Sequence, residues 1–167
     1  MRTVALVLVV CVLGAGAVIV YAAVNTTMSV EVRQVQVVDA AERPDEYARW
    51  QTALLREAAQ GTAFERNMTG TAQEYAFYIY TVDVSNRGLI TARMAELQVA
   101  PVEGDALTIS PAASLYRNVN ESVDIPAGTT RALQCILLTR AGGNAVRDLY
   151  LTYYIWGTAH TIRLTYG

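Results

Sequence analysis

The stretch that decides the fold is YAFYIYTVDVSNRGLITARMAELQV, residues 75 to 99. Its first half alternates in the manner of a β-strand, in which successive side chains point to opposite faces. The even-numbered positions are apolar throughout, and we expect them to face a core: Tyr78, Tyr80, Val82 and Val84. The odd-numbered positions are apolar only at the beginning, where Tyr75, Phe77 and Ile79 precede Thr81, Asp83 and Ser85. The second face of this strand is therefore expected to be covered over half its length.

The residues that follow predict further strands. Asn86-Arg87-Gly88 is a turn signal, and similar clusters of glycine, proline, asparagine and aspartate separate later apolar runs. We expect strands over 74–86, 89–100, 106–109, 113–119, 121–125, 130–140, 147–156 and 159–166, the last two joined by a turn at Gly157-Thr158-Ala159. Regularly spaced strands without repeated helices are typical of an antiparallel β-sandwich. The expected fold class is therefore mainly β.

The residues before the stretch add one strand and one helix. Valines alternate with polar residues over 29–40, with a one-residue slip near Arg33 that predicts a β-bulge. Over 44–60 the spacing of the apolar residues changes from the alternation of a strand to that of a helix. Pro44 suits the first turn of this helix, and Gly61 suits its end. Tyr47 and Trp50 would lie on the apolar face of this inserted helix. Either that helix covers Tyr75, Phe77 and Ile79, or those side chains form an exposed binding patch.

One family resemblance rests on two adjoining segments. The strand ending in VDVSNRG, residues 82 to 88, and the strand LITARMAELQVAP, residues 89 to 101, lie in a chain with one apolar N-terminal segment. Together they resemble the immunoglobulin-like, telokin-like and late-embryogenesis-abundant type-2-like domains of membrane-anchored exported proteins. The resemblance implies a β-sandwich and a non-enzymatic role, and it supplies no active-site residues.

The N-terminus predicts a membrane anchor. Residues 4 to 24, VALVLVVCVLGAGAVIVYAAV, carry no charge, and as a helix they would span about 31 Å, the thickness of a bilayer core. A cleavable signal peptide is the alternative, because small residues end at Ala17 and Ala22. We expect an anchor or uncleaved signal at 1–24 and an extracytoplasmic domain at 25–167. The domain would be secreted if the segment were cleaved.

Charge and cysteine content exclude some classes of function. The formal net charge is −2, and the thirteen basic residues, all arginine, do not cluster, so we expect no nucleic-acid binding. The exported part holds one cysteine, Cys135, and therefore no internal disulfide. Cys135 is expected to be buried as a small apolar side chain, with an intermolecular bridge as the alternative.

No catalytic, metal or cofactor site is expected. His160 is the only histidine, and no GxSxG nucleophile motif occurs. A hydrolase of wall polymers is kept as a third hypothesis, which would depend on His160 or Asp83. Asn67 and Asn120 lie in Asn-x-Ser/Thr sequons, which matter only in a host that glycosylates asparagine.

The leading functional hypothesis is a single-pass, membrane-anchored β-sandwich that binds or scaffolds another component of the cell envelope, a protein or a glycan, without catalysis. Aromatic side chains are enriched in binding patches, and Tyr150, Tyr154 and Trp156 on the expected outer face of the strand 147–156 form the candidate interaction surface. The alternative is a structural or accessory subunit of a surface appendage or secretion assembly, associating through strand edges.

Overall fold

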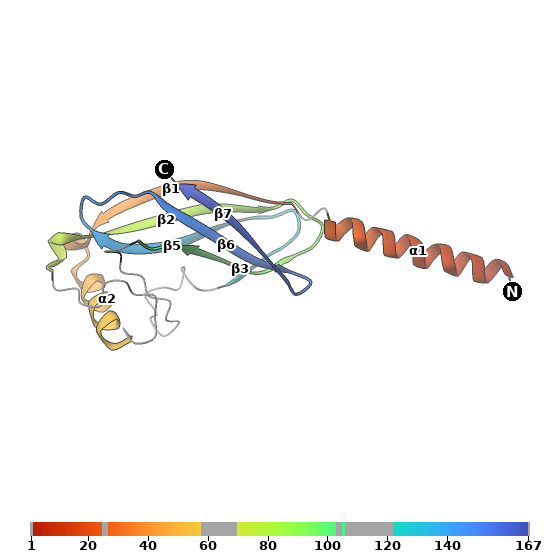
Figure 1. Ribbon diagram of the computed structural model, residues 1–167, viewed down its shortest axis with the longest axis horizontal. Coiled ribbons are helices and arrows are strands. Elements are labelled where there is room, and N and C mark those ends of the chain that lie inside the picture. The colour runs from red at the N-terminus through yellow and green to blue at the C-terminus, as the bar shows by residue number, and fades with distance from the viewer. Residues whose placement is uncertain (1, 25–26, 58–69, 103–104, 106–121, 167) are drawn as a thin grey trace.

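The computed structural model describes residues 2–24, 27–57, 70–102, 105 and 122–166, and Figure 1 shows their arrangement. A long helix, α1 (Arg2–Val24), projects from one end of a body of two β-sheets, and a second helix, α2 (Pro44–Glu57), lies at the opposite end. Within α1, Thr3–Ala22 is long and apolar enough to span a membrane or to act as a signal anchor. Nearly all of its side chains are exposed, with Ala22 at its end buried, as expected of a helix that meets lipid.

Seven strands are described, and the chain is mainly β as predicted. They are β1 (Met28–Asp39), β2 (Tyr75–Asn86), β3 (Ala92–Val99), β4 (Val123–Ile125), β5 (Thr130–Arg140), β6 (Arg147–Ile155) and β7 (Thr158–Tyr166). One sheet has the order β1-β2-β5 and the other the order β4-β3-β6-β7, and every described pairing is antiparallel. The chain crosses between the sheets after β2, β4 and β5, an arrangement compatible with a β-sandwich.

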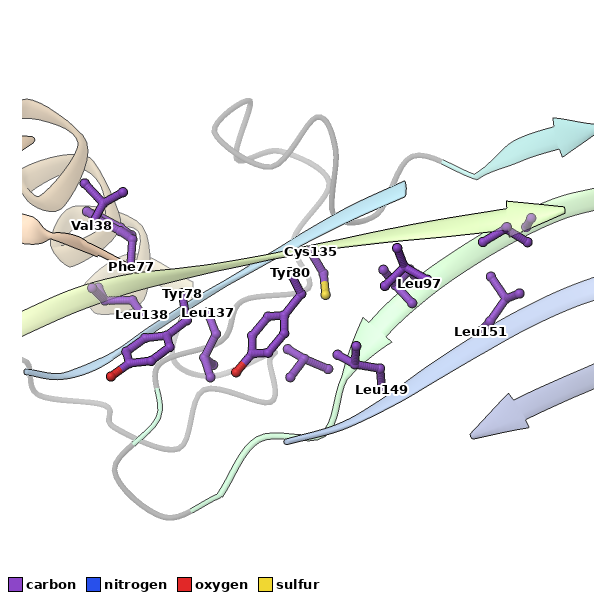
Figure 2. Packing of buried hydrophobic residues seen from close by; sticks show 14 of the residues in the cluster. Val38, Phe77, Tyr78, Tyr80, Leu97, Cys135, Leu137, Leu138, Leu149 and Leu151 are labelled. Carbon is purple, nitrogen blue, oxygen red and sulfur yellow. The ribbon is translucent and has the colours of Figure 1, made fainter. Parts of the chain in front are cut away.

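The core lies between the two sheets. Figure 2 shows Tyr80, Cys135 and Leu137 pointing from the first sheet to the side where the second sheet carries Leu149 and Leu151. All five side chains are fully buried. The even-numbered row of β2 forms this core as predicted, and Cys135 is buried as predicted. Burial raises the pKa of the Cys135 thiol to about 12, so the thiol is protonated at neutral pH.

Helix α2 covers the outer face of the first sheet at the start of β2. Trp50 packs edge-on against Phe77, with 5.7 Å between ring centroids, and Tyr47 packs against Tyr75 at 5.5 Å. Tyr47 also donates a hydrogen bond of 2.8 Å to the Gly70 carbonyl. Because all four rings are buried, the prediction of a helix-covered sheet is confirmed at these positions. An exposed aromatic patch there is excluded.

Local boundaries differ from the sequence-based expectations at two points. β3 begins at Ala92, not at residue 89, because the Asn86 side chain bonds the Ile90 carbonyl and the Gly88 N–H and so holds a turn there. The β6–β7 turn lies at Trp156-Gly157, one residue earlier than expected. The slip expected at Arg33 is confirmed by the register shift between Val32 and Gln34. The strands expected over 106–109 and 113–119 lie outside the described residues.

Candidate interaction surface

Tyr150 and Tyr154 lie on the outer face of the second sheet, where sequence reasoning placed them. Alternate residues of β6 are buried, and the residues between them, including both tyrosines, remain partly exposed. Tyr150 pairs across the sheet with Gln98 on one side and Arg163 on the other. Tyr154 pairs with Arg93 and Ala159. This face therefore carries two tyrosine rings, and an arginine on a neighbouring strand lies opposite each of them.

The residues between the two tyrosines are polar. Thr152 pairs with Glu96 of β3 and with Thr161 of β7, and the two threonine hydroxyls lie 3.4 Å apart. We call the outer-face residues of β3, β6 and β7 the aromatic-polar strip: Arg93, Glu96, Gln98, Tyr150, Thr152, Tyr154, Thr161 and Arg163. A flat strip of this composition can stack on sugar rings or meet a polar protein surface.

One end of the strip is fixed by charge. Asp148 accepts hydrogen bonds from the Thr165 hydroxyl at 2.6 Å and from the Arg163 guanidinium at 2.7 Å. These two bonds hold the pKa of the Asp148 carboxyl below its usual value. The carboxylate therefore stays ionised at neutral pH and keeps Arg163 in place opposite Tyr150.

The third predicted surface residue, Trp156, does not lie on this face of the sheet. It lies in the two-residue turn between β6 and β7, where Trp156 has a φ of 48° and Gly157 a φ of 80°. Two positive φ values are the pattern of a type I′ hairpin turn, which matches the twist of the strands it joins. Trp156 is 58% exposed. It therefore lies in the turn that follows β6 and not in the strand that carries the two tyrosines.

The residues of the hydrolase hypothesis are not brought together. His160 stacks on Tyr153, with ring centroids 5.3 Å apart and an interplanar angle of 16°. Asp83 lies in the middle strand of the other sheet and accepts a hydrogen bond of 2.8 Å from Arg33 Nε. Among the described side chains, no group of three or more histidines, cysteines, aspartates and glutamates is placed to hold a metal ion. Asn67 and Asn120 lie outside the described residues.

Sequence reasoning missed one buried polar cluster. The Arg147 guanidinium donates two hydrogen bonds of 2.8 Å to the Asp105 carboxylate, and both side chains are buried. Nearby, Tyr78 donates to the Gly143 carbonyl and Tyr80 to the Ala145 carbonyl, at 2.8 and 2.9 Å. Burial raises the pKa of the Tyr80 hydroxyl. Because each of these polar groups has a partner, the cluster fixes the loop before β6 and leaves no free group for chemistry.

Comparison with protein-family models and with curated proteins finds no match for this chain.

Proposed function

We propose that the protein is a single-pass membrane protein whose extracytoplasmic domain is an immunoglobulin-like β-sandwich and binds another component of the cell envelope. The apolar span Thr3–Ala22 supports the anchor, because 20 residues of exposed apolar helix need a lipid environment. Arg2, the charge before the span, favours a cytoplasmic N-terminus under the positive-inside rule. The strand orders β1-β2-β5 and β4-β3-β6-β7 support the immunoglobulin-like assignment, because they divide seven strands between two antiparallel sheets joined by crossing connections.

The observation that carries the binding role is the difference between the two outer faces. The first sheet buries Phe77 and Tyr75 under α2. The second sheet leaves Tyr150 and Tyr154 partly exposed in the aromatic-polar strip. Aromatic side chains held on a rigid sheet can bind at little entropic cost, because few rotatable bonds are ordered on association. The strip is therefore the surface that we assign to the partner.

Site-specific photo-crosslinking in intact cells tests this assignment. A benzophenone amino acid at Tyr154 should give a defined crosslinked product, identified by mass spectrometry or by its sensitivity to wall-degrading enzymes. The matched control is the same amino acid at Gln36, which is exposed on the outer face of the first sheet. Products of equal yield from both positions, or none from Tyr154, would contradict the assignment.

A second candidate function rests on the edge strand β7. It extends over nine residues, pairs with β6 without a register shift, and carries one charged residue, Arg163. The edge strand β1 is instead interrupted by the bulge at Arg33, a device that blunts strand edges. An open regular edge suits addition of a strand from another subunit, as in an appendage or secretion assembly.

Sedimentation of the detergent-solubilised full chain distinguishes the two candidates. A structural subunit should self-associate, and Ala159→Lys on β7 should reduce the association because charge blunts a strand edge. Tyr150→Ser removes an aromatic ring from the strip, and loss of the crosslink formed from position 154 without loss of assembly would favour the binding role.

A further inference from the structure

Three of the exposed large apolar side chains outside α1 lie at one end of the sandwich. Among the described residues, the three most exposed large apolar side chains beyond α1 are Leu89 at 63%, Trp156 at 58% and Met94 at 56%. Leu89 lies in the β2–β3 loop, Met94 near the start of β3, and Trp156 in the β6–β7 turn. Figure 1 shows that these elements meet at the end of the sandwich that faces α1.

The chain itself fixes this end near the membrane. Val24 is the last residue of α1, and Thr27 accepts a backbone hydrogen bond of 2.9 Å from Arg87 N–H. Three peptide units between Val24 and Thr27 reach at most about 11 Å. The loop that carries Leu89 therefore cannot move far from the end of the apolar span. We call the surface formed by Leu89, Met94 and Trp156 the proximal tip.

The part of the proximal tip around Leu89 is held by one buried side chain. Asn86 Nδ2 donates to the carbonyls of Ile90 and Ile125, at 2.8 and 2.9 Å, and its Oδ1 accepts from Gly88 N–H at 3.0 Å. The Asn86 side chain is buried. Asn86 thus holds the β2–β3 loop on both sides of Leu89 and ties this loop to the end of β4. A preorganised apolar surface loses little entropy when it binds.

The backbone at Trp156 points to a function beyond folding. A φ of 48° is the left-handed conformation, which glycine, asparagine and aspartate adopt readily and a bulky residue does not. A bulky side chain such as that of tryptophan is strained in this conformation. The hairpin turn requires a positive φ at this position, but the mostly exposed indole gives no packing reason within the described part of the sandwich for tryptophan in place of asparagine or glycine. Such an outlier supports a functional hypothesis.

Positive charge accompanies the apolar side chains. Arg87 lies in the same loop as Leu89, and Arg131 lies one residue into β5, opposite Val84 near the end of β2. Both side chains are exposed. Arg93 on β3 pairs with Asp124 across 3.5 Å, in an exposed position. Arginine at this level can reach lipid phosphates.

We propose that the proximal tip is a docking surface for the bilayer that α1 spans, with Trp156 and Leu89 in the interface and Arg87 and Arg131 on anionic headgroups. The amphipathic indole of tryptophan is favoured at the level of the headgroups. Docking holds the sandwich against the membrane and directs the other end, with α2, away from it. The proposal deepens the proposed function and rests on a retained anchor.

Tryptophan fluorescence of the full chain in lipid vesicles tests the proposal, because the two tryptophans lie at opposite ends. Trp50 packs on Phe77, and the nine residues from there to Asn86 place it about 30 Å from the tip. Vesicles of phosphatidylcholine and phosphatidylglycerol, brominated near the top of the acyl chains, should quench Trp156. Trp50→Phe should keep the quenching and Trp156→Phe should lose most of it. Equal quenching in wild type and Trp156→Phe overturns the proposal.

Two further measurements complete the test. Trp156→Asn should unfold at the same or higher urea concentration than wild type, because asparagine accepts a positive φ, yet it should lose the quenching. A fall in stability instead would make Trp156 a structural residue and overturn the proposal. Trp156 emission should shift further to the blue when phosphatidylglycerol is present than in phosphatidylcholine alone. The same emission in both compositions overturns the role of the arginines. The vesicles contain only the full chain, with its anchor, and lipid. These outcomes therefore do not depend on whether an envelope partner binds the strip.

Discussion

At the scale of single residues, Asn86 holds the β2–β3 loop through three side-chain hydrogen bonds. Asn86→Ala leaves the carbonyls of Ile90 and Ile125 and the N–H of Gly88 without their partner. We expect a loss of about 2–3 kcal/mol in the free energy of unfolding, since each buried group left unsatisfied costs roughly 1–3 kcal/mol. Urea denaturation of the detergent-solubilised chain measures this loss. The control is Asn144→Ala, which removes one exposed hydrogen bond to Val146 N–H. Equal losses in the two variants would contradict the assigned role of Asn86.

Cys135 gives the stability of the domain a dependence on alkaline pH. Burial raises the pKa of its thiol from 9.0 to about 12. Above pH 9.0 the unfolded chain loses this proton and the folded chain keeps it, so the free energy of unfolding falls as pH rises from about 9 to about 12. The raised pKa of Tyr80 acts in the same direction above the ordinary tyrosine range. Urea unfolding from about pH 7 to about pH 10 should show a steeper fall in wild type than in Cys135→Ala. Parallel curves would exclude a contribution from this thiol.

At the scale of secondary structure, α2 is held mainly by its aromatic face. Trp50→Ala removes a fully buried indole from its contact with Phe77, and we expect a loss of about 3–5 kcal/mol in the free energy of unfolding. The control is Arg49→Ala on the exposed face of the same helix, where a change within about 0.5 kcal/mol is expected. Circular dichroism during urea denaturation measures the free energy of unfolding of both variants. A small loss for Trp50→Ala would mean that the sheet is stable without this cover.

The periodicity of the elements explains how much the sequence could predict. The row of Tyr78, Tyr80 and Val82 shows the period of two, and Tyr47 with Trp50 shows the helical spacing. Local pattern therefore predicted the β2 strand, the α2 helix and the contact between them. It could not predict that Arg147 pairs with Asp105, because the residues lie 42 positions apart. Nor did alternation reveal that Trp156 leaves the face of Tyr150 and Tyr154, since the turn gives it a positive φ.

The candidate surfaces follow from register more than from composition. Arginine opposite Tyr150 comes from a strand 13 positions on, and Arg93 opposite Tyr154 from the strand β3 on the other side. Which of several exposed arginines accompanies an aromatic residue depends on strand order, which a single sequence specifies only weakly. The proximal tip depends also on the arrangement in space, because the ends of β2 and β6 and the beginning of β3 meet beside α1 (Figure 1).

At the scale of the whole molecule, the arrangement depends on α1 remaining attached. Val12 lies near the middle of the span Thr3–Ala22, and Val12→Arg should weaken insertion by about 3 kcal/mol, or roughly a hundredfold. The control, Val12→Leu, should leave insertion unchanged. We expect wild type and Val12→Leu to resist alkaline carbonate extraction and to retain residues 1–24 by intact mass, while Val12→Arg is released. Protease added to spheroplasts should digest the sandwich and leave the N-terminus protected. If the wild-type protein were instead recovered free of membrane and without residues 1–24, the segment would be a cleaved signal peptide. The proposals of a retained anchor and of docking at the proximal tip would then both be wrong.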